Sequence, residues 1–379
     1  MPNHNGPGAP LRQASRSPAL LAAYFTVALR LAYSGLAALF TPHLNLDARL
    51  IESNRLTEQL MQPSEGLRYA WLGVWERFDT LWYIHIAQHG YDRPDAVGFF
   101  PLYPLLLRVV SWLIDPLAAA LLVSTLSAFF LFWGFQKLLR LDQPAEDATR
   151  ALLLYAAWPA SFIFFCGYAE SLVVALLIWS IYFARTGRWW CSGITGCLAG
   201  LSKAVGWLAI VPQAVLGWRQ RKWRALAAGL TLVGPGAFAL WLKLSGRMLP
   251  SEAYPRYWLT DTAPPWTTLW DSVGAAVAGR SRILEVHLLV LAVVAVLALW
   301  RNLRPEYTLY AAVALCFILT KHADPTQQPW TRYVLILFTA PANLAAWLRN
   351  GTALTVGTLL LFLANVLFLR LFLGWSLVV

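Results

Sequence analysis

The sequence predicts an all-α polytopic membrane protein. Its mean hydropathy is +0.53, 58% of its 379 residues are hydrophobic and only 13% are charged. A soluble domain usually has an apolar fraction near half and a charged fraction near a quarter. Apolar runs of roughly 15 to 24 residues recur along the chain, close to the ~20 residues that a helix needs to cross a bilayer. The runs lack the period-two alternation of a membrane barrel, so helices are the expected spanning elements.

About eleven apolar runs are expected to span the membrane. The fifth and sixth are short, and together they could form one broken element around Lys203. The expected spans are residues 18–41, 116–136, 149–165, 169–184, 189–202, 204–217, 225–244, 283–300, 306–320, 332–347 and 352–373.

The loops between these runs suggest an orientation. If residue 1 is cytoplasmic, most loop arginines and lysines face the cytoplasm, as the positive-inside rule requires. Residues 1–17 are then a disordered cytoplasmic tail, and residues 18–379 form a single transmembrane domain. Two segments on the outer side are long enough to carry a polar working face, namely 42–115 and 246–282.

The composition argues against several other classes of function. The net charge of +11 comes from basic residues scattered over short loops, so nucleic acid is not an expected partner. The four cysteines fall inside apolar runs without metal-ligand spacing, which supports neither a disulfide framework nor a zinc site and favours buried small side chains. They are Cys166, Cys191, Cys197 and Cys316.

The most polar stretch is "WERFDTLWYIHIAQHGYDRP", residues 75–94. No proline interrupts it between Asp79 and Gly90, so a helix is expected there, with Gly90 as its stop. After it, the apolar run "GFFPLYPLLLRVVSWL" is broken by two prolines and favours a helix lying on the membrane surface. Asp79 would then sit at the outer surface, where a carboxylate is a functional candidate. Pairing with Arg77 only to stabilise the fold is an equal alternative.

A metal site is not expected in this stretch. His85 and His89 are four residues apart and could share a ligand-bearing helix face, but no third ligand stands in register with them.

Five segments resemble the GPI mannosyltransferase 2 family. The specific one is "RFDTLWYIHIAQHGYDRPDAVGFFPLYPLLLR", which is similar to the family's first outer-loop signature. The others are "YAAWPASFIFFCGYAESL", "LAGLSKAVGWLAIVP", "YPRYW" and "QPWTRYVL". The chain departs from the family at Phe78, where Trp is usual, and at 155–157, where an Asn is missing. Lys203 and Ala204 replace Arg and Ser, which keeps a positive charge but loses bidentate phosphate contact and puts the acceptor in doubt.

The resemblance implies a GT-C type glycosyltransferase. It would move mannose, with inversion, from a polyprenyl- or dolichyl-phosphate donor to a hydroxyl of a lipid-linked or glycan acceptor on the non-cytoplasmic face. Asp79 would be the general base. Lys203, Arg332 and Arg256 would bind the donor phosphate. The residues implied in substrate binding are Glu170, Arg77, Tyr83, Tyr168, Tyr257 and Trp258.

Two other functions stay open from the residues. A lipid-linked sugar flippase or transporter would place charges at mid-membrane in matched halves, and no such repeat is visible. A non-catalytic subunit of a glycosylation complex would not need the Asp79 segment. No cofactor is expected, and dependence on a divalent metal, the donor sugar, the acceptor and the oligomeric state are left open. Membrane lipids are expected partners, and a prokaryotic plasma membrane is favoured over the endoplasmic reticulum.

Overall fold

The computed structural model describes residues 17–44, 46, 56, 60–61, 63–220, 223–300 and 303–375. Within these ranges the chain forms 17 α-helices, several 3₁₀ turns and one pair of two-residue strands. The predicted all-helical, polytopic class is therefore confirmed. The tail predicted over residues 1–17 lies outside the described ranges except for Ser17.

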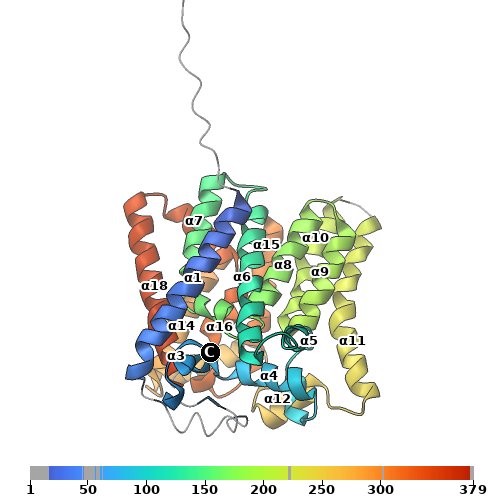
Figure 1. Ribbon diagram of the computed structural model, residues 1–379. Helices are drawn as coiled ribbons and strands as arrows, with labels where there is room; N and C mark the ends of the chain where they lie inside the picture. The colour runs from blue at the N-terminus through green and yellow to red at the C-terminus, as the bar shows by residue number, and fades with distance from the viewer. Residues whose placement is uncertain are drawn as a thin grey trace, which may run out of the picture.

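Five helical segments among the described residues are long and apolar enough to cross a membrane. All five coincide with predicted spans, and in Figure 1 they run in roughly the same direction through the bundle. They are α1 (Pro18–Phe40), α6 (Pro116–Leu139), Ala225–Leu244 with η8 (Trp223–Gly229) and α11 (Leu230–Leu244), α14 (Arg282–Leu299) and α18 (Gly351–Leu373).

The other predicted spans are shorter helices in the structure. They include α7 (Ala145–Ala156), α8 (Glu170–Arg185), α9 (Trp189–Ser202), α10 (Ile210–Gln220), α15 (Pro305–Leu319) and α17 (Thr339–Trp347).

Three predicted spans are interrupted, which corrects the expectation of continuous helices. In the run 149–165, the helix α7 ends at Ala156. Pro159 prevents its continuation, because proline lacks an amide hydrogen and restricts the backbone conformation of the residue before it. A 3₁₀ turn, η6 (Ser161–Phe165), follows. The run 204–217 begins as the 3₁₀ turn η7 (Ala204–Ala209) before α10. The run 332–347 divides into α16 (Trp330–Tyr333), η10 (Val334–Ile336) and α17, whose first turn accommodates Pro341.

The two long predicted outer segments meet at one end of the bundle. The helices α3 (Leu67–Trp71), α4 (Asp79–His89), α5 (Leu102–Val110) and α12 (Pro250–Tyr257) gather at the lower end in Figure 1. The phenol of Tyr254 in α12 donates a hydrogen bond to the carbonyl of Gly98 at 3.0 Å, in the 3₁₀ turn η5 (Pro94–Gly98). After α12, strand β1 (Asp261–Thr262) pairs antiparallel with β2 (Lys321–His322), which follows α15. This end therefore brings together segments from the whole chain.

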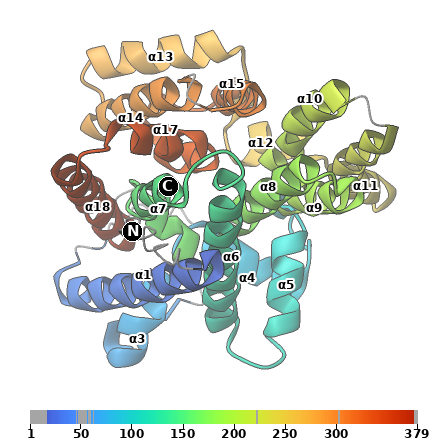
Figure 2. The same cartoon turned by 90° about the horizontal axis from the view of Figure 1, so that it is seen from above.

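Seen from above, the helices form groups around a packed centre. α13 (Pro265–Val277), α14 and α15 lie on one side, α8 to α11 on another, and α1 with α6 on a third, with α7 and α17 between them (Figure 2). Helices α9 and α11 approach closely at Gly196, where an added Cβ would lie 2.1 Å from Oγ1 of Thr231. Close packing through glycine is typical of helices in membranes.

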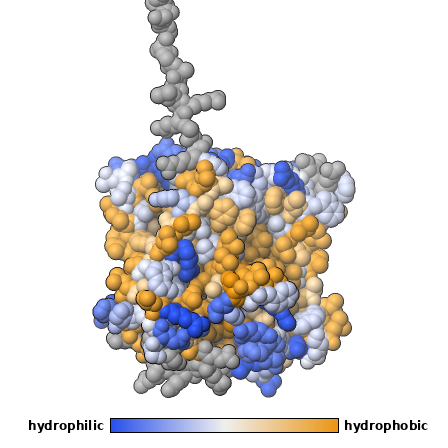
Figure 3. Space-filling view, viewed as in Figure 1, coloured by the Kyte–Doolittle hydropathy of each residue, from blue (hydrophilic) through white to orange (hydrophobic). Residues whose placement is uncertain are grey.

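The outer surface of the bundle is suited to lipid. On the face seen in Figure 3, hydrophobic side chains dominate the middle and hydrophilic ones gather toward the two ends. Large apolar side chains are exposed on α1, α14 and α18, among them Leu31, Val293 and Leu360. Such a surface is stable in a bilayer and would aggregate in water.

Candidate active site

Asp79 begins helix α4 from a strained turn. The preceding Phe78 has a φ of 47°, in the left-handed region that a residue with a Cβ rarely adopts. Its ring is held in place against the rings of Trp375 and Phe372, at centroid distances of 4.7 and 5.7 Å. Asp79 is the first residue of the helix, where the free amide groups favour a negative side chain. The C-terminal end of the described chain thus fixes the turn that presents Asp79.

Four charged side chains from distant parts of the sequence lie together, and we call them the charged cluster: Asp79, Glu170, Lys203 and Arg332. Arg332 Nη1 donates to Asp79 Oδ2 at 2.6 Å, and Arg332 Nε lies 3.5 Å from Glu170 Oε1. The ammonium of Lys203 bonds to the same Glu170 oxygen. The side chain of Glu170 is only 3% exposed, whereas that of Asp79 is 21% exposed. Asp79 is therefore the more exposed carboxylate of the cluster.

The start of α8, which supplies Glu170, is positioned by a buried loop between α7 and α8. This loop, residues 157–169, contains the short 3₁₀ turn η6 but no longer helix, and side chains donate to several of its carbonyls. Asn365 Nδ2 donates to the carbonyl of Trp158 at 2.6 Å, and Arg30 Nη1 donates to that of Phe165 at 2.6 Å. Ser124 Oγ donates to the carbonyl of Tyr168 at 3.0 Å. Side chains of α1, α6 and α18 together hold the loop.

Two glycines allow close approach around the cluster. An added Cβ at Gly167 would lie 2.5 Å from Cγ2 of Thr80, so glycine lets the loop pack against the start of α4. An added Cβ at Gly206 would lie 1.9 Å from the carbonyl oxygen of Ala199. The chain can therefore fold back onto α9 directly after Lys203, at the predicted helix break.

Tyrosines line the charged cluster. The hydroxyl of Tyr168 accepts from the amide of Asp79 at 3.4 Å, and the guanidinium of Arg332 lies 5.5 Å from the centre of its ring. Burial raises the pKa of Tyr83 well above its usual range, and the charges of Glu170 and Asp79 raise it further. The predicted residues Asp79, Glu170, Lys203, Arg332 and Tyr168 are thus brought together, with Tyr83 beside them.

Three residues at the cluster were missed by sequence reasoning. The ammonium of Lys321 lies 4.6 Å from the ring centre of Tyr333 and 5.3 Å from that of Tyr254. Tyr333 also carries the guanidinium of Arg332 over its ring, at 5.4 Å. Both tyrosines belong to segments with the family resemblance. Lys321 directly follows an apolar run at its predicted outer end, where the positive-inside rule does not expect a lysine, and that was the available signal.

Arg77 has a structural position, contrary to the predicted substrate contact. It is 2% exposed, and its guanidinium donates to the carbonyl of Leu373 at 2.8 Å, to that of Glu76 at 3.0 Å and to the hydroxyl of Tyr69 at 3.0 Å. Its donors are used within the protein, where they tie the turn before Asp79 to the end of α18.

The segment 254–258 contributes differently from the prediction. Trp258 Nε1 donates to the carbonyl of Asp95 at 3.1 Å and its ring packs on Trp82, so Trp258 joins the outer segments. Arg256 is exposed and lies over the ring of Tyr257 at 5.6 Å. The residue of this segment that faces the cluster is Tyr254.

The histidines and cysteines noted in the sequence have other surroundings than the charged cluster. His85 Nε2 lies 2.8 Å from Asp92 Oδ1, and within the described ranges no three His, Cys, Asp or Glu side chains are grouped so as to hold a metal. Cys166 is buried as expected, but Cys191 and Cys316 are exposed. Their place on apolar helices explains this difference, because the sequence pattern does not tell a lipid-facing side from a core side.

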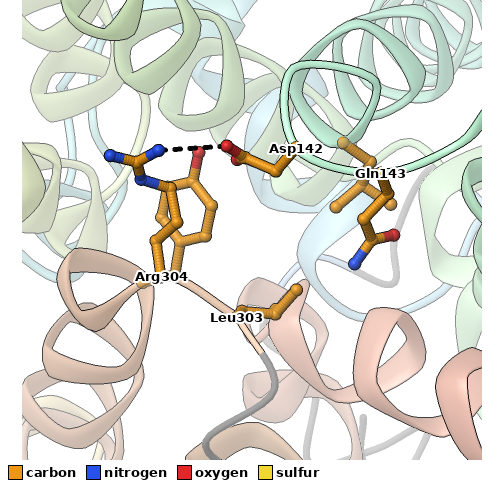
Figure 4. A pocket seen from close by; sticks show the side chains of 6 residues that line it. Asp142, Gln143, Leu303 and Arg304 are labelled. Carbon is orange, nitrogen blue, oxygen red and sulfur yellow. Dashed lines mark hydrogen bonds and ion pairs between the residues drawn. The ribbon is translucent and has the colours of Figure 1, made fainter.

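A polar pocket lies at the opposite end of the bundle, where α6 ends and α15 begins. Its volume is about 160 Å³, and Figure 4 shows Asp142 and Arg304 facing each other across it. Arg304 Nη1 lies 3.1 Å from Asp142 Oδ1, and Arg185 pairs with the same carboxylate at 2.7 Å. Burial raises the pKa of Asp142, but these two arginines lower it below its usual range overall. The residues lining the pocket are Leu139, Asp142, Gln143, Leu303, Arg304 and Tyr307.

The acids around this pocket are paired with arginines of the protein. Glu306 is fully buried and accepts from Arg304 Nε at 2.7 Å and from Arg219 Nη1 at 3.3 Å. These ion pairs join the ends of α6, α8, α10 and α15, and we call them the clamp. The pocket therefore belongs to this structural feature and not to the site at Asp79.

Comparison with known proteins agrees with the resemblance seen in the sequence. Residues 23–221, just over half of the chain, match the family described as Mannosyltransferase (PIG-V). The chain is 31% identical over 150 residues to GPI alpha-1,6-mannosyltransferase 2 of Cricetulus griseus, a match that covers 36% of this chain and 30% of that protein. The Mus musculus protein of the same name is 31% identical over 161 residues, covering 39% and 32%. For Homo sapiens the identity is 31% over 143 residues, covering 35% and 28%.

The matched part therefore spans about a third of these relatives. The family match, residues 23–221, contains Asp79, Glu170 and Lys203 but not Arg332, which the fold adds to the same cluster. On the strength of the match over 23–221, the chain belongs to the PIG-V mannosyltransferase family of membrane enzymes.

Proposed function

We propose that this protein is an inverting mannosyltransferase of the GT-C type. It would transfer mannose from a polyprenyl- or dolichyl-phosphate donor to a hydroxyl of a lipid-linked or glycan acceptor on the non-cytoplasmic face. Residues 18–379 would act as one transmembrane domain with about eleven spans, the shorter apolar helices completing the five long ones. The segments 42–115 and 246–282 would supply the outer working face.

The observation that carries the proposal is the environment of Asp79. Arg332 occupies its Oδ2, while its Oδ1 has no partner among the described residues and the side chain is partly exposed. A carboxylate held by one oxygen and open at the other can accept a proton from an acceptor hydroxyl. The positive charges of Arg332 and Lys203 lie nearby, and they can stabilise the negative charge of the donor phosphate.

The reaction is a single displacement at the anomeric carbon. The acceptor oxygen forms a bond to that carbon as the bond from the carbon to the phosphate oxygen breaks, and the electron pair leaves on the lipid phosphate. The hydroxyl proton passes to Asp79 Oδ1. The buried tyrosines around the cluster limit access of water, which favours transfer over hydrolysis.

Replacing Asp79 by Asn tests this assignment. We expect transfer from polyprenyl-phosphate mannose to extracted membrane lipids, measured with purified protein in detergent, to fall by about 10²- to 10⁴-fold, because the base is removed and the shape is kept. Asp147→Asn, the same change in the first turn of α7, should leave the rate unchanged. Retention of most transfer by a folded Asp79→Asn protein would remove Asp79 from the mechanism.

The same assay separates the rival functions. A flippase has no second compartment to serve in detergent micelles, and a non-catalytic subunit transfers nothing when purified alone. Sugar transfer by the isolated wild-type protein would therefore exclude both. Supplying polyprenyl-phosphate glucose in parallel tests the choice of mannose.

A further inference from the structure

The charged cluster is balanced without Lys321. Asp79 and Glu170 contribute two negative charges, and Arg332 and Lys203 contribute two positive charges that are already paired with them. Lys321 lies next to this balanced set, and no carboxylate oxygen of the described residues lies within 4.0 Å of its ammonium. Among the described residues, the site therefore carries one positive charge without a carboxylate partner.

The position of Lys321 is fixed by its surroundings. Its backbone pairs with Thr262 across β1 and β2, and its carbonyl accepts from Gln328 Nε2 at 3.0 Å. Its side chain is partly buried between Tyr254 and Tyr333. Aromatic faces attract a cation but carry no net charge, so they compensate only part of the cost of burying an ammonium.

A second cation shares the same ring. The guanidinium of Arg332 and the ammonium of Lys321 lie 5.4 and 4.6 Å from the ring centre of Tyr333. The positive charge of Arg332 disfavours the charged form of Lys321, and an anion beside the two cations relieves this repulsion. Burial lowers the pKa of Lys321, but Tyr333 and Tyr254 raise it above its usual value overall, so the group is charged at neutral pH.

We propose that Lys321 binds the phosphate that joins the lipid to the sugar of the donor, and that Lys203 serves to hold Glu170. This inference rests on the proposed function and changes its predicted phosphate ligand. A donor phosphate is a diester with one negative charge, which matches the single unneutralised cation. After transfer it becomes a monoester that gains negative charge, so Lys321 contacts the leaving group more strongly as the reaction proceeds.

Binding of the lipid product tests the site without requiring any transfer. The probes are polyprenyl phosphate, the uncharged polyprenol and phosphatidic acid, added to purified protein in detergent while its melting temperature is recorded. We expect polyprenyl phosphate to stabilise the wild-type protein and polyprenol to have no comparable effect. Lys321→Met should weaken this binding by about tenfold or more, since a charge-assisted contact to phosphate is lost. Lys321→Arg should keep most of it.

Two variants control for folding and for general charge. Lys243→Met removes an exposed lysine at the end of α11 and should bind polyprenyl phosphate as the wild type does. If Lys321→Met melts early without ligand, Lys321→Gln keeps a polar tip and gives the same comparison. Equal binding by the wild type and a folded Lys321 variant would overturn the inference. Equal stabilisation by phosphatidic acid through Lys321 would also overturn it, because the site would then take any lipid phosphate.

Steady-state transfer separates this inference from the proposed function. We expect Lys321→Met to raise the KM for the donor by about tenfold or more and to lower kcat as well. Transfer that depends on Asp79 but not on Lys321 would refute only the role of Lys321. Polyprenyl phosphate binding that depends on Lys321, in a protein that transfers no sugar, would refute only the transferase.

Discussion

At the scale of single residues, Arg332 connects the two acids of the site. Its Nη1 bonds to Asp79 and its Nε lies beside Glu170, so one planar side chain sets the position of both carboxylates. Lysine has the same charge but no fork of donors and cannot make both contacts. The orientation of the Asp79 carboxylate therefore depends on the shape of the guanidinium as well as on its charge.

Replacing Arg332 by Lys should lower kcat for transfer by about 10- to 100-fold, because a hydrogen bond to a charged group is worth roughly 1.5–3 kcal/mol. Initial rates at saturating donor measure this effect. Arg247→Lys makes the same change at an exposed position after α11 and should leave the rate unaltered. If both variants transfer at the wild-type rate, the geometry of Arg332 has no part in the reaction.

At the scale of elements, the irregular segment between α7 and α8 is as important as any helix. It occupies the interior of the bundle without a regular ladder, and Asn365 of α18 satisfies two of its acceptors, the carbonyl of Trp158 and the hydroxyl of Ser161 at 2.5 Å. A buried acceptor without a donor costs free energy, so the conformation of this segment depends on α18. The segment leads directly to Tyr168 and Glu170.

Replacing Asn365 by Leu should lower the free energy of unfolding by about 1–3 kcal/mol, because each of these buried acceptors loses one of its hydrogen bonds. Thermal unfolding of the detergent-solubilised protein measures the loss. Thr352→Val changes an exposed residue of the same helix and should have little effect. An unchanged melting temperature for Asn365→Leu would show that the segment does not depend on this side chain.

At the scale of the whole molecule, the two ends of the bundle differ in kind. The end that holds Asp79 combines the two long loop segments, short helices and a partly exposed carboxylate. The other end holds the clamp of Asp142, Arg185, Arg304 and Glu306, whose charges are paired within the protein. The exposed apolar side of α5, with Leu105 and Val109, suits contact with the membrane surface near the reactive end.

Labelling of single cysteines tests the orientation of the two ends. In a background with the four natural cysteines replaced by alanine, Ser251→Cys in α12 should react with an impermeant maleimide on intact cells. Thr186→Cys, after α8, should react only when the membrane is opened, because a charged reagent does not cross the bilayer. A background protein with unchanged transfer activity serves as the control. The reverse labelling pattern would place Asp79 on the cytoplasmic side and contradict the proposed orientation.

The sequence alone was sufficient for the membrane class and for the boundaries of several helices, and it singled out four residues that the fold brings together. The expected spans 18–41, 189–202 and 352–373 agree with α1, α9 and α18 to within a residue at each end, because length and hydropathy determine which segments can cross lipid. Asp79, Glu170, Lys203 and Arg332 were found because they stand within or beside segments that resemble a family.

The tertiary structure decided how these groups are used. Arg77 and Arg332 are both arginines in such segments, yet one is fully bonded inside the protein and the other bridges two acids. Lys203 is paired with Glu170, whereas Lys321 has no carboxylate partner among the described residues. The balance of charge at the cluster depends on distances between segments that are far apart in the chain. A local sequence pattern does not determine those distances.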